Sequence, residues 1–404
     1  MRILVLTQYI YPETFKSTDL VFNLAERGHN VEVLTGIPNY PEGHYFEGYG
    51  LFKKRVETIN GVRFYRCFQT PRKLLPSLLG LSLNYLTFMI CAYIWVLFFF
   101  VWRKKYDAII THEPSPITQI LPAILLGKLK GIKVYSWIMD IWPDSVTDVL
   151  DEKISKYIIP PLRWVTNRVY KGSDKLLITS KGFAEMINRD ADYSSKIIYF
   201  PNWCDDILKM DDCYDIPSIP EGFVIMVAGN LGEAQNLEAV SEAIKLARGN
   251  KIIKWVFVGD GSKKKWLDGF IETNGLSETA ITLGRFPFTA MPAFFKKANA
   301  MLVSLAPGFK FLDVTVPARL QSYMSAGRPV LAMLGSGGAE IIKESDCGYV
   351  VAPGDYKALV QIINERVLTD LEGFEKKGEN GRRFFEKKFE IDGCIDRLEE
   401  IIKS

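Results

Sequence analysis

Short apolar runs alternate with longer segments of helical character along the first half of the chain. Each run is rich in valine, isoleucine and leucine and lacks a polar face, which is typical of a strand that is buried on both sides of a sheet. Strands that alternate with helices favour a parallel α/β architecture. The predicted strands are residues 2–7, 31–35, 62–68, 107–111, 132–137, 174–179 and 196–199.

The second half repeats the same alternation, and the predicted strands are residues 223–228, 255–258, 281–283, 300–304, 329–333 and 349–351. A polar, Asp-rich stretch separates the two halves and ends in an Ile-Pro-Ser-Ile-Pro sequence that is typical of a linker. The pattern therefore predicts two Rossmann-like parallel-sheet domains that face each other across a cleft. We expect a first domain over 1–203, a linker over 204–220, a second domain over 221–385, and a C-terminal helix over 386–404 that packs back on the first domain.

Residues 74–102 carry no charge and are mostly apolar, which is long enough to cross a bilayer. Three structures fit this composition: a membrane span, a helix that lies in one leaflet, and a buried core helix. Predicted strands lie on both sides of the segment, and a span would place them on opposite sides of the membrane. The topology therefore favours monotopic insertion, with Arg72, Lys73 and the basic residues 103–105 at anionic head groups.

Composition and charge narrow the classes of partner. The 404 residues are 48% hydrophobic and 24% charged, as in an ordinary folded protein. Residues 1–200 hold 25 Lys and Arg against 18 Asp and Glu, a net charge of +7, whereas residues 201–404 hold 25 against 29, a net charge of −4. A basic first half suits an anionic surface. Because the chain has no recognisable nucleic-acid module, we expect membrane lipid as that partner and no nucleic acid.

The sequence predicts neither a disulfide framework nor a metal centre. The six cysteines form no C-x-x-C pair, which indicates reduced thiols in a cytoplasmic protein. Only three histidines occur, and no Asp-x-Asp motif stands at a strand end. The first apolar run is too short for a secretory signal.

Polar side chains follow two predicted strands of the first half. His112 and Glu113 end one strand before a proline, and Asp140 and Trp142 follow the next strand. Aromatic faces stack on sugars and carboxylates bind sugar hydroxyls, so these residues are candidates for a sugar site; a surface-loop histidine and a packed tryptophan with a capping aspartate are the alternatives. Lys16, near a helix start after the first strand, is a candidate phosphate ligand or a plain solvated lysine.

In the second half, Gly229-Asn230 and Gly259-Asp260 each end a strand and precede a helix, where the backbone can approach a phosphate closely. Pro317 suits the first turn of a helix that Gly327 would end. Arg319 adds a guanidinium to that first turn, and together with the helix N-terminus it predicts a diphosphate site. The alternative is a surface arginine on a short helix.

These motifs resemble the retaining, nucleotide-sugar-dependent glycosyltransferases of family 4, which have the GT-B fold. A closer resemblance is to the WbuB-type enzymes of surface polysaccharide synthesis. The general likeness is carried by His112-Glu113-Pro114, Gly229-Asn230-Leu231-Gly232, Val258-Gly259-Asp260-Gly261, Leu283-Gly284-Arg285 and Ser325-Ala326-Gly327-Arg328-Pro329, and the closer one by Thr35–Gly43, Glu113–Thr118, Asp140-Ile141-Trp142-Pro143 and Gly229–Gln235.

The resemblance implies roles for these residues. His112 would orient the donor sugar, Arg319 would stabilise the departing phosphate, and Asp140 would serve the acceptor side. Two family patterns differ. The Glu-x7-Glu pattern falls on Val314 and Ser322, with Asp313 and Gln321 one residue earlier, and the usual Arg and Lys at the donor diphosphate fall on Asn230 and Gln235. The implied donor-binding residues are Gly229, Asn230, Gln235, Gly259, Asp260, Arg285, Thr315, Gln321 and Ser322, and the acceptor or phosphate candidates are Lys16, Glu113 and Trp142.

The function implied is transfer of a sugar from a UDP-sugar to a polyprenyl-diphosphate-linked sugar in bacterial surface polysaccharide synthesis. N-acetyl-fucosamine is one candidate for the sugar. The enzyme would be a peripheral or monotopic protein on the cytoplasmic face of the inner membrane, contact anionic lipid, and need no metal or cofactor, the UDP-sugar being a substrate. Two alternatives share the fold: an isomerase of the UDP-N-acetylhexosamine 2-epimerase type and a catalytically inactive sugar-binding partner.

Overall fold

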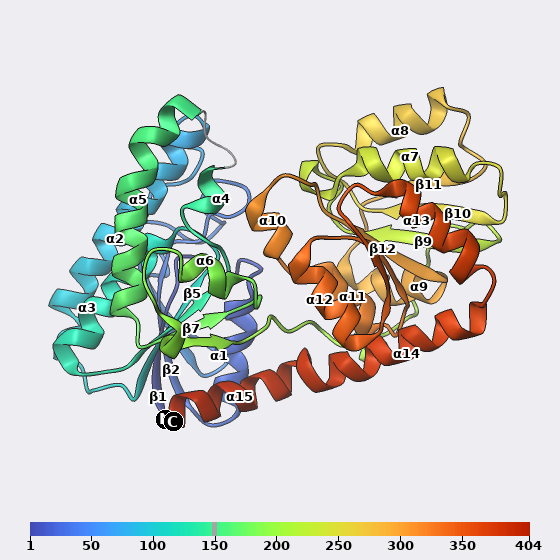
Figure 1. The fold of residues 1–404 in the computed structure, drawn as a ribbon. Coiled ribbons are helices and arrows are strands. Elements are labelled where there is room, and N and C mark those ends of the chain that lie inside the picture. Colours follow the sequence, from blue (N-terminus) through green and yellow to red (C-terminus); the bar gives the residue numbers. More distant parts are fainter. Residues whose placement is uncertain (148–151) are drawn as a thin grey trace. The chain divides into compact units, whose positions relative to one another are not determined.

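The computed structural model describes residues 1–147 and 152–404 and divides into two compact α/β units (Figure 1). The first unit comprises Met1–Phe200 and Ile395–Ser404, and the second comprises Pro201–Cys394. Each unit has its own sheet and its own hydrophobic core, so each is described by itself.

The sheet of the first unit has eight strands in the order β3-β4-β2-β1-β5-β6-β7-β8. All neighbours are parallel except β3 and β4, which form an antiparallel hairpin at one edge. The central strands β1 and β5 are almost entirely buried, as their continuous apolar sequences predict. The strands are β1 (Arg2–Leu6), β2 (Asn30–Gly36), β3 (Val56–Ile59), β4 (Val62–Cys67), β5 (Ala108–Glu113), β6 (Val134–Ile138), β7 (Lys175–Ile178) and β8 (Ile197–Tyr199).

Helices cover both faces of this sheet. The helices α2, α3 and α5 lie along one face, and α1 lies on the other (Figure 1). The chain end belongs to the α1 side, because Arg27 after α1 pairs with Asp396, and His29 lies 3.2 Å from the Glu399 carboxylate. The elements are α1 (Lys16–Glu26), α2 (Ser77–Phe98), η1 (Phe100–Trp102), η2 (Ile117–Ile120), α3 (Leu121–Lys130), α4 (Asp144–Thr147), α5 (Glu152–Gly172), α6 (Phe183–Ile187), η3 (Ser194–Lys196) and α15 (Ile391–Lys403).

Helix α2 has one buried stripe and one exposed apolar ridge. Asn84, Phe88, Ala92 and Val96 recur every four residues and are fully buried against the unit. The opposite side is exposed although it is just as apolar, and only 22% of the apolar window from Leu78 to Trp102 is buried. This segment is long and apolar enough to cross a membrane. The exposed ridge consists of Leu78, Leu79, Leu86, Ile90, Ile94, Leu97, Phe98 and Trp102.

The second unit has a six-stranded, fully parallel sheet in the order β11-β10-β9-β12-β13-β14. Two apolar clusters fill its two faces, one around Phe294 and Tyr323 and the other around Trp255 and Leu302. The strands are β9 (Phe223–Ala228), β10 (Ile253–Val258), β11 (Ala280–Gly284), β12 (Ala300–Ser304), β13 (Val330–Met333) and β14 (Gly348–Val351). The helices are η4 (Ile207–Lys209), η5 (Glu233–Gln235), α7 (Leu237–Ala247), α8 (Lys264–Thr273), η6 (Phe288–Ala290), α9 (Met291–Lys296), α10 (Lys310–Val314), α11 (Ala318–Ser325), α12 (Ser336–Ser345), α13 (Tyr356–Ile362), η7 (Ile363–Val367) and α14 (Leu371–Lys388).

The boundaries differ from those that the sequence predicted for the segment 204–220 and for the tail from 386. Cys204 and Ile207 are buried in the second unit, so the beginning of the expected linker is part of that unit's core. Asp206 fixes it there by an ion pair with Arg382 of α14. The tail joins the first unit only from Ile395, because Phe385 and Phe389 are still buried in the core of the second unit.

Candidate functional site

A cavity of about 540 Å³ opens at the carboxyl ends of β9 and β10 in the second unit. Glycines let two backbone loops approach each other there: a Cβ on Gly259, which has a φ of 154°, would lie 1.8 Å from the carbonyl oxygen of Gly229. The cavity is lined by Gly229, Asn230, Val258, Gly259, Asp260, Gly261, Arg285, Phe286, Phe288 and Met291. Five of the predicted donor-binding residues therefore share one cavity.

Arg319 lies beside this cavity, in the first turn of α11. Its Nη2 donates a 2.8 Å hydrogen bond to the carbonyl oxygen of Asn230. Tyr323, one turn later, ties the helix to the end of β9, because its hydroxyl donates to the carbonyl oxygen of Ala228 at 3.1 Å. Pro317 is the N-cap of α11, and Gly327 follows the helix with a φ of 65°. The guanidinium is thus placed next to backbone N–H groups that suit a phosphate.

The other four predicted donor residues make contacts inside the second unit instead of lining that cavity. Gln235 accepts a hydrogen bond from the Gly232 N–H, and Thr315 donates to the carbonyl oxygen of Phe311. Gln321 is 3% exposed and donates to the Asn202 carbonyl, while the Ser322 hydroxyl lies 3.1 Å from the Cys204 thiol. Because α11 turns this side toward 202–204, Gln321 and Ser322 hold that segment on the second unit.

His112 lies at the end of β5 in the first unit, with its side chain only 1% exposed. It packs between Phe15 and Trp137, whose ring centroids lie 6.5 and 5.0 Å from its own. Burial lowers the pKa of His112 to about 3, so the imidazole is neutral at physiological pH. Neither ring nitrogen has a hydrogen-bond partner among the described residues.

Two carboxyl groups lie close to each other at the neighbouring strand ends. Glu113 is fully buried, and burial together with the nearby charge of Asp140 raises the pKa of its carboxyl group well above the usual range. Burial also raises the pKa of Asp140. The Ser115 hydroxyl donates to Asp140 at 3.2 Å and accepts from the Trp142 indole at 2.9 Å. Asp140, Ser115 and Trp142 are therefore joined in one hydrogen-bonded group, with Glu113 beside it.

Lys16 is the first residue of α1, as predicted, but its ammonium group lies 3.6 Å from the Asp19 carboxylate. Its positive charge is thus partly balanced within the same turn, and no other predicted site residue contacts it among the described interactions.

From the sequence, Arg72 was predicted only to lie next to lipid head groups. Tyr9, Tyr40 and Tyr85 were not predicted as site residues. Arg72 lies over the rings of Tyr9 and Tyr40, with its Cζ 5.8 and 5.0 Å from their centroids. Tyr85 of α2 lies within electrostatic reach of Arg72, Asp140 and Glu113. The position of Arg72 shortly after the carboxyl end of β4 was the available signal, since ligand-binding residues gather at that edge of a parallel sheet.

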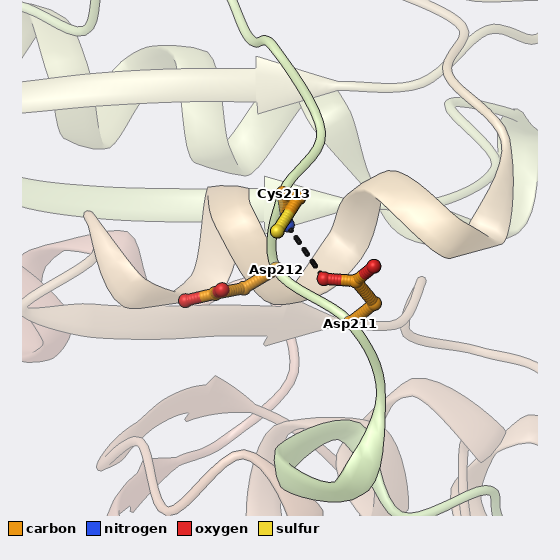
Figure 2. A group of neighbouring side chains, drawn as sticks. All are labelled: Asp211, Asp212 and Cys213. Atoms are coloured by element: carbon orange, nitrogen blue, oxygen red, sulfur yellow. Dashed lines mark hydrogen bonds between the residues drawn. The ribbon is translucent and has the colours of Figure 1, made fainter.

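Within the described ranges, one group of three side chains has metal-ligand chemistry: Asp211, Asp212 and Cys213 (Figure 2). All three are exposed, and two are already engaged. Asp212 pairs with Lys296 at 2.8 Å, and Asp211 accepts a hydrogen bond from the backbone N–H of Cys213. We therefore assign no metal site to this group.

Comparison with protein families and known proteins gives the same two-part division. Residues 17–203 match the glycosyl transferase 4-like domain, and residues 214–384 match the glycosyl transferases group 1. WbjE of Pseudomonas aeruginosa, named as a probable glycosyltransferase, is 24% identical over 67% of this chain and 68% of its own. WcaI of Escherichia coli K12, whose name provisionally assigns it to colanic acid biosynthesis as a glycosyl transferase, is 24% identical over 76% of both chains.

Solved structures share the fold at low sequence identity. Anabaena HepE in complex with UDP has a TM-score of 0.69 at 15% identity, with 100% of both chains covered. The lipopolysaccharide outer core galactosyltransferase WaaB, in its apo form, has a TM-score of 0.66 at 16% identity and covers 100% of this chain and 99% of its own. The prediction of the GT-B fold is confirmed. A glycosyl transferase 4-like domain followed by a group 1 domain accounts for most of the chain, which therefore belongs to the GT-B glycosyltransferases of the group 1 and family 4 type.

Proposed function

We propose that this glycosyltransferase moves a sugar from a UDP-sugar to a polyprenyl-diphosphate-linked sugar in bacterial surface polysaccharide synthesis. The observation that carries the proposal is Arg319, which is hydrogen-bonded to Asn230 beside a glycine-lined cavity. Relatives support the pathway class, because WcaI is assigned to colanic acid biosynthesis and WaaB is a lipopolysaccharide galactosyltransferase. The structure of HepE with UDP supports UDP as the nucleotide.

On the donor side, the proposed chemistry is departure of the diphosphate from the sugar. The bond between the sugar's anomeric carbon and the phosphate oxygen breaks as the acceptor oxygen bonds to that carbon. In the retaining scheme, the acceptor attacks from the same face, and its proton passes to the leaving phosphate oxygen. Arg319 and Arg285 then supply positive charge at the diphosphate, so that no metal ion is required.

On the acceptor side, Asp140 is proposed to bind a sugar hydroxyl, and Trp142 to contact the sugar ring. The Ser115 hydroxyl is hydrogen-bonded to both side chains, so their relative positions are set before the acceptor binds. His112 is proposed to orient the donor sugar. A neutral imidazole can hydrogen-bond a hydroxyl without adding charge, and because the ring is covered in the free protein, we expect the contact to form only with substrate bound.

For localisation, we propose monotopic association with the cytoplasmic face of the inner membrane through α2. The buried stripe of α2 is attached to the unit along its length: Asn84 accepts a 2.6 Å hydrogen bond from the Tyr9 hydroxyl near one end, and Phe100 packs on Tyr65 just beyond the other. A helix held in this way cannot also cross the bilayer alone. Its exposed apolar ridge suits insertion into one leaflet, and Trp102 and residues 103–105 suit the interface.

A panel of nucleotide sugars, with and without a polyprenyl-diphosphate-linked sugar, tests this function. We expect UDP release from one donor that depends on the lipid-linked acceptor. Isomerisation of the sugar without acceptor would indicate an epimerase instead, and donor binding without turnover would indicate a binding partner.

A further inference from the structure

Arg72, near the carboxyl edge of the first sheet, has no anionic partner in the part of the chain that the structure describes. Two other arginines of this unit have carboxylate partners: Arg66 lies 2.8 Å from Glu57, and Arg103 lies 2.7 Å from Glu32. Arg72 instead lies over the rings of Tyr9 and Tyr40, and among the described residues no carboxylate pairs with it and no oxygen accepts a hydrogen bond from it. A guanidinium on aromatic faces keeps its N–H groups available for an incoming anion.

The surface under Arg72 is held in place by buried contacts. Tyr9 is 3% exposed, and its hydroxyl donates to Asn84 of α2. Tyr40 is fixed through its backbone, because its N–H donates to the buried Glu13 carboxylate at 2.7 Å. The rings of Tyr9 and Tyr40 are 5.8 Å apart. This pair therefore forms a fixed platform that can position the guanidinium before a ligand binds.

Exposed apolar side chains follow Arg72 closely in the sequence. The leucines just before α2 and in its first turn are largely exposed, with exposed fractions from 44% for Leu75 to 68% for Leu79. These side chains continue into the exposed ridge of α2. An isoprenyl chain is a ligand of suitable chemistry for such a surface. The leucines are Leu74, Leu75, Leu78 and Leu79.

Candidate sugar-binding residues are connected to Arg72 through Tyr85 of α2, which interacts electrostatically with both. Burial raises the pKa of Tyr85, the positive charge of Arg72 opposes this rise, and the carboxyl groups of Asp140 and Glu113 add to it. The tyrosine is thus near both the cation and the carboxyl pair. Because carboxylates repel phosphate, a diphosphate is favoured at Arg72, whereas Asp140 favours a sugar hydroxyl.

The surroundings of Arg72 thus offer three kinds of chemistry, which suit a lipid, a diphosphate and a sugar: exposed leucines that follow it in the chain, its own guanidinium, and carboxyl groups that interact with Tyr85. We propose that Arg72 binds the diphosphate of an isoprenyl-diphosphate-linked acceptor, with the leucines 74–79 receiving the isoprenyl chain and Asp140 and Trp142 receiving the sugar. The identification of this ligand as the acceptor rests on the proposed function, whereas the binding site itself rests on the contacts of Arg72.

Binding of farnesyl diphosphate to the full-length protein, followed by titration calorimetry, tests the site without any need for activity. We expect Arg72→Ala to weaken binding by about 10- to 100-fold, as for the loss of one charge-assisted contact, and Arg72→Lys to lose less. The matched control is Lys133→Ala, which removes the same charge at an exposed position of the same unit outside α2. It should bind as the wild type does.

Inorganic pyrophosphate and vesicles that contain phosphatidylglycerol serve as further probes. We expect both to bind more weakly than farnesyl diphosphate and to respond less to Arg72→Ala. Wild-type protein that fails to bind farnesyl diphosphate, or equal losses in Arg72→Ala and Lys133→Ala, would overturn the site. A circular dichroism spectrum like that of the wild type shows that each variant is folded.

Acceptor-dependent UDP release, measured on the same proteins, separates this inference from the proposed function. Binding that depends on Arg72 without any transfer would refute the function and leave the site standing. Transfer that is unaffected by Arg72→Ala would refute the site and leave the function standing.

Discussion

Arg319 is the residue on which the proposed binding of the donor diphosphate depends. Its guanidinium is fixed by the carbonyl oxygen of Asn230, so it needs little rearrangement to stabilise a leaving diphosphate. We expect Arg319→Ala to reduce turnover by about 10²–10³, or roughly 3–4 kcal/mol, and to weaken UDP binding. Steady-state kinetics and UDP titration measure the two effects.

The matched control for this variant is Arg248→Ala, which removes an exposed arginine at the C-cap of α7 in the same unit. It should leave both quantities near the wild-type values. If Arg319→Ala also keeps wild-type turnover while folded, the diphosphate is stabilised by another group.

His112 makes the stability of the protein depend on acidity. The folded pKa of about 3 lies below the usual value of 6.5, so between these values the unfolded state binds the additional proton. The free energy of unfolding therefore keeps its full contribution from the neutral His112 above pH 6.5. It decreases as the pH falls from 6.5 toward 3, by up to about 1.4 kcal/mol per pH unit. Urea denaturation of the wild type and His112→Asn at several pH values should show a shallower acid loss in the variant. Parallel curves would contradict the buried, neutral imidazole.

Five residues that the sequence placed at strand ends line one cavity, but the sequence did not show which side of α11 faces that cavity. Arg319 could be selected because the first turn of a helix after a proline is recognisable in a sequence. Gln321 and Ser322 were selected because the Glu-x7-Glu pattern of the resembled family falls on or next to them, yet they contact Asn202 and Cys204. Which side of a short helix faces a cavity depends on tertiary packing, and the spacing of residues does not contain that information.

At the scale of elements, α2 determines how the protein would meet a membrane. The uncharged composition of residues 74–102 predicted a helix but not which face is exposed. Trp95 and Phe99 pack on Tyr65, with ring centroids 5.9 and 5.3 Å apart, so substitutions there would damage the core of the unit. Ile94 and Phe98 are 51% and 76% exposed and test the ridge alone.

We expect Ile94→Glu combined with Phe98→Glu to move the protein from the membrane to the soluble fraction, because two charges on the ridge oppose insertion. Vesicle flotation measures the change, and circular dichroism checks the fold. The control is Leu51→Glu with Phe52→Glu, which places two charges on apolar residues that are exposed outside α2. Equal flotation of the α2 variant and the wild type would refute insertion through the ridge.

The strands were the most predictable elements, because buried parallel strands have continuous apolar sequences between turns. The segment after Phe200 was less predictable. Its many aspartates predicted a linker, but Asp206 is paired with Arg382, 176 residues away in the sequence. A polar segment that is held by one distant partner has no signature within its own sequence.

For the whole molecule, the proposed mechanism places arginines and a helix N-terminus at the diphosphate, and it therefore predicts catalysis without a metal ion. We expect turnover to survive an excess of EDTA. Loss of activity with EDTA that magnesium or manganese restores would show that a cation acts at the diphosphate in place of this arrangement.

The most direct test of the central claim is the mass of the lipid product. Wild-type protein, a UDP-sugar and a polyprenyl-diphosphate-linked sugar should yield a lipid that is heavier by one sugar residue, and Arg319→Ala should yield far less of it in the same time. An unchanged lipid mass, together with a converted or hydrolysed UDP-sugar, would contradict transfer to a lipid-linked acceptor.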